Sequence, residues 1–163
     1  MITNVSLVTV YCLDQTATRG FYIDTLGFEA GTDITMGEGF RWVTIKHPSQ
    51  PELEVTLMTP GPPLDAEAAD FIRRQLEKGG MGGLGLSVDD CHKTFEELSA
   101  KGVTFLQEPA DRPYGVEAVM RDTPATGSYW SSPRSSRRRT SNSSRGLRHG
   151  LAVSCTLTVN QVT

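Results

Sequence analysis

The stretch SVDDCHKTFEELSAKGVTF, Ser87–Phe105, predicts a β-strand, an α-helix and a second β-strand in immediate succession. Either Asp89 or Asp90 can cap the helix, because a carboxylate accepts hydrogen bonds from the free N–H groups of the first turn. The apolar residues that follow recur at helical spacing. Gly102 ends the helix, since glycine readily takes the left-handed conformation beyond a helix C-terminus. This strand-helix-strand unit is the pattern that we look for in the rest of the chain.

The same order is present near the N-terminus. Val5–Cys12 is rich in β-branched residues and predicts a strand. Asp14 can cap a helix over Gln15–Leu26, and Gly27 ends it. Alternating apolar residues and turn signals then predict three more strands, over residues 28–36, 40–47 and 53–59. Residues 1–60 therefore predict a β-α-β-β-β module.

The second module follows a linker and one extra helix, which occupy residues 61–80. The run PGPP, Pro60–Pro63, predicts a stiff linker, and Asp65 can cap a helix that Gly79 stops. Residues 81–122 then predict a strand near Leu84, the helix after Asp90 and two further strands, which gives β-α-β-β. No clear final strand completes this second module.

Three strings in this order resemble a known family. They are FYIDTLGFE at 21–29, the stretch at 87–105, and EPADRPYGVEAVMRD at 108–122. Together they are similar to the glyoxalase/bleomycin resistance protein/dioxygenase superfamily, the vicinal oxygen chelate proteins. The resemblance implies an α+β fold in which two βαβββ modules form a curved, mainly antiparallel sheet cup, here with the last strand of the second module altered. It also implies a homodimer.

The resemblance marks four positions for metal ligands in the cup, one from the first and one from the last strand of each module. Leu7 and Gly83 occupy the two first-strand positions, and neither side chain can bind a metal. Glu54 falls at a last-strand position and is a weak candidate. The fourth strand is not recognisable. We therefore expect no resident metal, because one carboxylate does not hold a divalent ion tightly.

Other side chains are candidates for binding a small organic molecule in the cup. Arg41 can hold a carboxylate because a guanidinium forks onto two oxygens, although a surface ion pair with an acid such as Glu38 is the simpler interpretation. Ordinary packing is the simpler interpretation for most of the rest. The full candidate set is Tyr11, Arg41, Trp42, Thr44, Glu54, Thr56 and Tyr114.

The function that this set predicts is binding of a small molecule without the usual metal chemistry, and no catalytic residue is assigned. The alternative is a lyase or dioxygenase of the same superfamily that uses Fe, Mn, Ni or Zn, which are metals suited to imidazole and carboxylate ligands. No nucleophile-base pair, phosphate loop or dinucleotide fingerprint is present in the sequence. The sequence therefore leaves the ligand and any reaction open.

Composition favours a cytoplasmic protein of one or two small modules in its 163 residues. No apolar run approaches the roughly 20 residues of a membrane span. The first residues do not have the pattern of a secretory signal. Cys12, Cys91 and Cys155 are far apart and odd in number, so they suggest neither a disulfide framework nor a zinc site.

Residues 123–163 differ sharply in composition from the rest. All 19 acidic residues precede this tail, whereas six arginines and nine serines lie in it. Codons for TPATGSYW, which begins at Thr123, permit NSGNWFVL after a one-base shift, so we hypothesise a frameshifted tail. Sequencing the gene decides this, because a one-base change near codon 123 must restore a family-like strand.

Nucleic-acid binding by the arginines of the tail is the rival hypothesis. Separately, polar and apolar residues alternate over residues 151–159, which predicts a strand.

Overall fold

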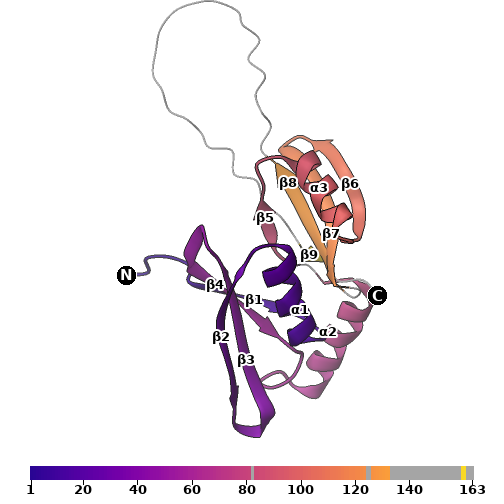
Figure 1. Ribbon diagram of the computed structural model, residues 1–163. Coiled ribbons are helices and arrows are strands. Elements are labelled where there is room, and N and C mark those ends of the chain that lie inside the picture. Colours follow the sequence, from indigo (N-terminus) through magenta and orange to yellow (C-terminus); the bar gives the residue numbers. More distant parts are fainter. Residues whose placement is uncertain (82, 124–125, 133–158, 161–163) are drawn as a thin grey trace, which may run out of the picture.

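The computed structural model describes residues 1–81, 83–123, 126–132 and 159–160 of the chain (Figure 1). These residues form two modules of the same design, joined by a separate helix. The predicted α+β fold with two β-α-β-β-β repeats is confirmed. The elements of the first module are β1 (Leu7–Tyr11), α1 (Gln15–Gly20) with a π-helical turn (Phe21–Thr25), β2 (Glu29–Met36), a 3-10 turn (Gly37–Gly39), β3 (Phe40–His47) and β4 (Gln50–Met58).

The first sheet has the strand order β1-β4-β3-β2. β1 runs parallel to β4, and the other neighbours are antiparallel. The helix begins where the sequence predicts, because Asp14 accepts hydrogen bonds from the N–H groups of Thr16 and Ala17. β1 and β2 are the two edges of this sheet.

The second sheet repeats the first, with the order β5-β8-β7-β6. Sequence analysis ended this module at residue 122 as β-α-β-β, whereas the structure adds β8, which pairs with β7 and with β5. Backbone hydrogen bonds from two neighbours define a strand without any side-chain pattern, which is why the sequence did not mark it. The elements are β5 (Gly85–Ser87), α3 (Cys91–Ala100), β6 (Phe105–Arg112), β7 (Gly115–Thr123) and β8 (Thr126–Ser132).

The arginine run and most of the predicted strand at 151–159 lie outside the described residues. Only β9 (Val159–Asn160) is described there, and it pairs with β8 at Gly127 and Ser128. The frameshift and nucleic-acid hypotheses for the tail therefore stay as sequence hypotheses.

The helix α2 (Ala66–Lys78) lies between the modules in the chain and stands beside the first sheet (Figure 1). Asp65 caps it, and Gly79 ends it with a φ of 68°, a conformation that favours glycine. Arg73 ties the helix to the linker by donating a hydrogen bond of 3.1 Å to the carbonyl oxygen of Pro60. None of the helices in the described part of the chain combines the length and apolar character that crossing a bilayer requires.

Each module has its own hydrophobic core between its sheet and its helix. Val43, Ile45 and Leu57 are completely buried in the first core, and Met120 is completely buried in the second. Three apolar side chains pack against both cores, namely Phe21, Leu26 and Leu86. They join the two modules.

Candidate functional site

Strand alternation divides the residues of the first sheet between two faces. Val43, Ile45 and Leu57 belong to the core under α1. The opposite face, which we call the cup face, carries five of the predicted binding residues and two others: Tyr11, Trp42, Thr44, Glu54 and Thr56, with Phe40 and Met58. The sequence pattern therefore brought five candidates to one surface.

Polarity changes along the cup face from one row of cross-strand neighbours to the next. Glu54 lies between Leu7 on β1 and Lys46 on β3. The next row consists of threonines, with Thr56 between Thr9 and Thr44. The third row is apolar and aromatic. In this row Tyr11 lies beside Met58, and Trp42 lies beside Ile34. A ligand on this face would meet charge at one end and rings at the other.

The threonines form the floor of the cup face. Thr44 and Thr56 are completely buried, so neither side chain is open to a ligand in this arrangement. The Thr44 hydroxyl accepts a hydrogen bond of 2.8 Å from the N–H of Thr32. The Thr56 hydroxyl has no hydrogen-bond partner among the described residues.

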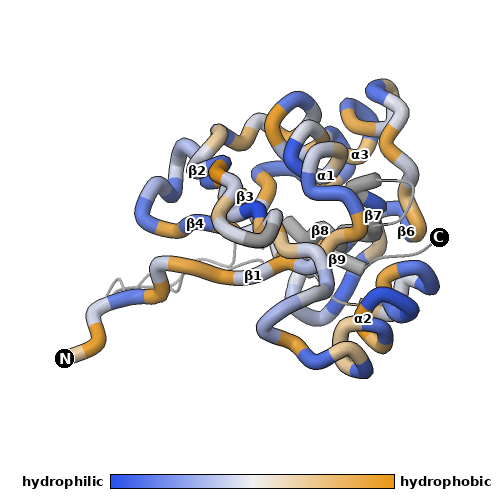
Figure 2. The backbone as a smooth tube through the Cα atoms, turned by 90° about the horizontal axis from the view of Figure 1, so that it is seen from below, coloured by the Kyte–Doolittle hydropathy of each residue, from blue (hydrophilic) through white to orange (hydrophobic). Residues whose placement is uncertain are grey.

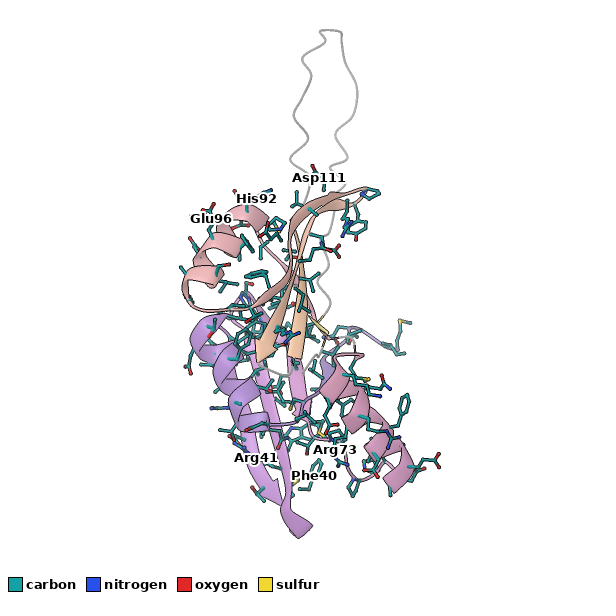
Figure 3. The ribbon with its side chains drawn as sticks, turned by 90° about the vertical axis from the view of Figure 1, so that its right-hand side faces the viewer. Phe40, Arg41, Arg73, His92, Glu96 and Asp111 are labelled. Carbon is teal, nitrogen blue, oxygen red and sulfur yellow. The ribbon has the colours of Figure 1, made fainter. Side chains whose placement is uncertain are left out.

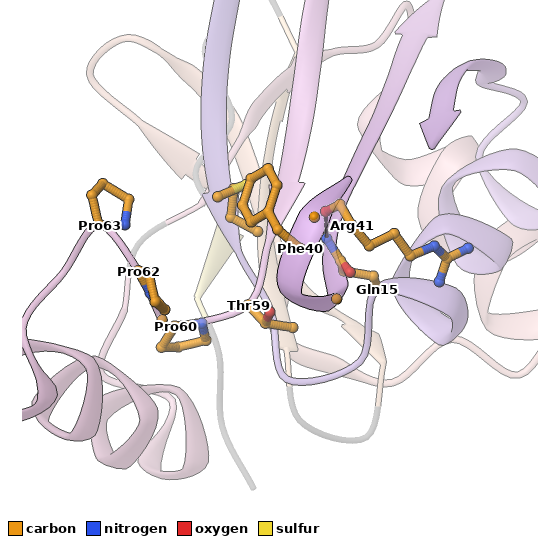
Figure 4. A pocket seen from close by; sticks show the side chains of 11 residues that line it. Gln15, Phe40, Arg41, Thr59, Pro60, Pro62 and Pro63 are labelled. Carbon is orange, nitrogen blue, oxygen red and sulfur yellow. Dashed lines mark hydrogen bonds between the residues drawn. The ribbon is translucent and has the colours of Figure 1, made fainter. Parts of the chain in front are cut away.

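A pocket of about 520 Å³ opens at the aromatic end of the cup face (Figure 4). Phe40 and Met58 contribute apolar surface from the sheet, and the linker contributes its prolines. A volume of this size suits a drug-sized organic molecule, and binding pockets for such molecules are mostly apolar with a few polar groups. The pocket is therefore the candidate binding site.

Gln15 and Thr59 are polar residues of the pocket lining that the sequence did not single out, and Gln15 is the more buried of the two. Gln15 is the first residue of α1, it is 9% exposed, and it lines the pocket. Phe40 and Met58 could have been found by extending the period of two from Trp42 and Thr56. No sequence pattern indicated Gln15, because its side chain is held by hydrogen bonds to the backbone of residues 26 and 42 positions further along the chain.

Arg41 lies on the helix-facing side of β3, and its guanidinium points away from Phe40 and the prolines (Figure 4). Its fork grips the Asp33 carboxylate through two hydrogen bonds of 2.8 Å, and a third, of 2.7 Å, goes to the Thr16 hydroxyl. The ion-pair partner among the described side chains is Asp33, and the predicted partner Glu38 has a side chain outside the described part. The hydrogen bonds from Arg41 lower the pKa of the Asp33 carboxyl, which Arg19 lowers further by charge.

Replacing Asp33 by asparagine is expected to lower the thermal unfolding midpoint at pH 7, and the difference is expected to shrink as pH falls below the unfolded pKa of about 3.9. A carboxyl whose pKa is lowered in the folded protein stabilises it above the unfolded pKa of about 3.9, and that stability is lost as pH falls through the folded pKa. Unfolding of both proteins followed from pH 7 to pH 2 measures the difference. Glu97→Gln is the matched control, because the Lys93–Glu97 pair is mostly exposed and such pairs contribute little. A pH-independent effect of D33N would contradict this prediction.

Tyr114, the remaining candidate, is not on the cup face. It lies in the turn between β6 and β7 of the second module and is 53% exposed. Figure 3 labels Asp111, which lies near the same turn, and shows it toward the opposite end of the molecule from Phe40. His92 is exposed on α3 (Figure 3). The structure therefore groups neither residue with the pocket.

The residues at the three metal positions that the sequence identifies do not fit a metal. Leu7 pairs directly with Glu54, so the two first-module positions are neighbours, and only one has a donor. In the second module the first-strand position is Gly83, two residues before β5, and glycine has no side chain. Across the described residues, no group of three or more His, Cys, Asp or Glu is placed to hold an ion.

The sequence also matches a family of known proteins. Residues 4–128 match the model of the Glyoxalase/Bleomycin resistance protein/Dioxygenase superfamily. The chain belongs to this superfamily. Uncharacterized protein YurT of Bacillus subtilis (strain 168) is 30% identical over 117 residues, which are 72% of this chain and 89% of YurT.

Two solved structures of similar proteins bear on the fold. The crystal structure of UcmS2 is 39% identical, with a TM-score of 0.68 over 83% of this chain and 100% of UcmS2. TnmS3, described as an antibiotic binding protein from Streptomyces sp. CB03234, is 23% identical, with a TM-score of 0.61 over 81% of this chain and 97% of TnmS3. The superfamily fold is therefore shared across the part of the chain that carries both modules.

Proposed function

We propose that this superfamily member binds a small organic molecule with an aromatic body, and that it does so without the usual metal set. The observation that carries the proposal is the pocket of about 520 Å³ at the aromatic end of the cup face, with Phe40 and Met58 on one side and the linker prolines on the other. Aromatic rings gain from offset or edge-on contact with one another in addition to burial of apolar area. The description of TnmS3 as an antibiotic binding protein supports this class of function.

Binding of 1-hydroxypyrene, a fluorescent fused-ring probe, tests the proposal. Saturable one-to-one binding is expected for the full chain, followed by probe fluorescence. Phe40→Ala is expected to weaken binding about tenfold, which corresponds to roughly 1.4 kcal/mol of lost contact. Phe71→Ala is the matched control, because Phe71 is 54% exposed on α2 and is not part of the pocket wall. No saturable binding, or equal weakening by both variants, would count against the proposal.

The alternative is a metal-dependent lyase or dioxygenase, for which Glu54 is the available carboxylate. Elemental analysis of the same purified protein for Fe, Mn, Ni and Zn separates the two functions. One equivalent of metal that is lost in Glu54→Ala would overturn the proposed function and favour the alternative. Substoichiometric metal that is unaffected by the substitution would support binding without metal.

We further propose that the protein is a cytoplasmic homodimer. β1 is an edge strand of the first sheet, and such edges present unpaired backbone groups that another chain can use. The N-terminal arm extends away from the body (Figure 2) and carries exposed apolar residues: Met1, Ile2 and Val5. Cys12 and Cys91 are buried, and the odd number and wide spacing of the cysteines suggest no disulfide framework, which suits a reducing compartment. Light scattering on the purified protein gives the molar mass, and that of a monomer would contradict the dimer.

A further inference from the structure

The orientation of the Gln15 side-chain amide is fixed by its surroundings. Its Nε2 donates one hydrogen bond of 2.7 Å to the carbonyl oxygen of Leu57 and another of 3.0 Å to that of Arg41. Both partners are acceptors, so only the nitrogen end of the amide can face them. The two bonds use both hydrogens of Nε2 and hold the start of α1 against β3 and β4.

The oxygen end of the amide is left for the pocket. Gln15 is nine-tenths buried, and among the described residues no group donates to its Oε1. Gln15 lines the pocket beside Phe40 (Figure 4). Oε1 is not among the fully buried side-chain atoms without a partner, so water in the pocket can donate to it until a ligand takes the place of that water.

The described residues that line the pocket do not donate to Oε1. Phe40 and Met58 have no conventional donor, and Pro60, Pro62 and Pro63 lack the backbone N–H that other residues offer. The lining also holds Arg41, Thr59 and three glycines, whose N–H and O–H groups make no hydrogen bond to Oε1. The pocket therefore presents a fixed acceptor beside an apolar surface. Such a combination discriminates between ligands, because a ligand without a donor would bury the acceptor unpaired.

We infer that Gln15 Oε1 accepts a hydrogen bond from an O–H or N–H group on the ligand, so that the pocket selects aromatic molecules that carry a donor. The inference rests on the proposed function and deepens it. It gives Gln15 a direct contact with the ligand as well as its contacts with the two strands. Because both Nε2 hydrogens are already used, Gln15 cannot rotate to serve ligands that carry an acceptor instead.

A matched pair of probes tests the inference on the unmodified protein. 1-Hydroxypyrene and 1-methoxypyrene share one ring system, but only the first can donate a hydrogen bond. We expect the hydroxyl compound to bind about tenfold more tightly, the scale set by burying an acceptor unpaired. The methyl group of 1-methoxypyrene adds apolar area, which favours binding of this compound. Apolar burial alone would therefore give the opposite preference.

Gln15→Leu assigns the preference to this residue. The variant has no acceptor, so the ratio of the two dissociation constants is expected to fall from about ten to one or below. Gln15→Met, which is longer and more flexible, is the second variant, and circular dichroism and thermal unfolding check that each variant folds. A purely structural role for Gln15 would weaken both probes by the same factor and leave the ratio unchanged.

Each outcome decides a separate question. Equal binding of the two probes by the unmodified protein overturns the role of Gln15 and leaves the proposed function standing. A preference that persists in both variants also overturns it, because another acceptor would then be responsible. Binding of neither probe overturns the proposed function itself.

Discussion

Gly31→Ala is expected to lower the free energy of unfolding by roughly 3 kcal/mol, at the upper end of what overpacking costs. A Cβ atom at Gly31 on β2 would lie 2.3 Å from the Thr44 hydroxyl oxygen and 3.1 Å from the Thr44 carbonyl oxygen. Thr44 cannot yield easily, because it is completely buried and its hydroxyl holds the N–H of Thr32. The alanine would either break that hydrogen bond or move β2 away from β3. Urea denaturation of both proteins measures the loss.

Two further variants make this prediction specific. Gly37→Ala is the control, because a Cβ atom there meets nothing within 4 Å, and its effect is expected to stay within about 1 kcal/mol. The double variant G31A/T44A removes the closest clashing atom. Its loss of stability is expected to be smaller than the sum of the two single losses, since residues in contact do not act additively. Additive losses would show that Gly31 matters for another reason.

The parts of the fold that depend on local pattern were predictable from the sequence. A period of two placed Trp42 and Thr44 on one face of the first sheet, and Glu54 and Thr56 on the same face of the neighbouring strand, which the register confirms. The capping role of Asp14 follows in the same way, because a helix N-terminus recruits an acceptor one residue before it. These features follow from each segment's own geometry.

The pocket was not predictable from the sequence, because its walls come from three places that only the folded chain brings together. Gln15 begins α1, Phe40 follows the turn after β2, and the prolines lie beyond β4. The Arg41–Asp33 pair is a similar case. The sequence suggested Glu38 because it is closer in the chain, whereas the hairpin of β2 and β3 brings Asp33 to the guanidinium. Contacts across a sheet depend on register, which a single sequence specifies weakly.

Phe21→Ala is expected to destabilise both modules together, by roughly 2–4 kcal/mol, somewhat below the range for a fully buried phenylalanine. Phe21 lies where α1 passes into the π-helical turn, and it packs against the cores of both modules. Alanine is a good helix former, so the loss comes from packing and not from the helix itself. Phe71→Ala, at an exposed position of α2, is the control and is expected to stay within about 0.5 kcal/mol.

The chain provides one tryptophan in each module for this measurement. Trp42 lies on β3, and Trp130 lies on β8. In a W130F background the fluorescence of Trp42 reports the first module, and in a W42F background that of Trp130 reports the second. Because Phe21 belongs to both cores, F21A is expected to move both urea transitions by the same amount. A shift of the Trp42 transition alone would mean that the modules unfold independently and that the contact at Phe21 does not couple them.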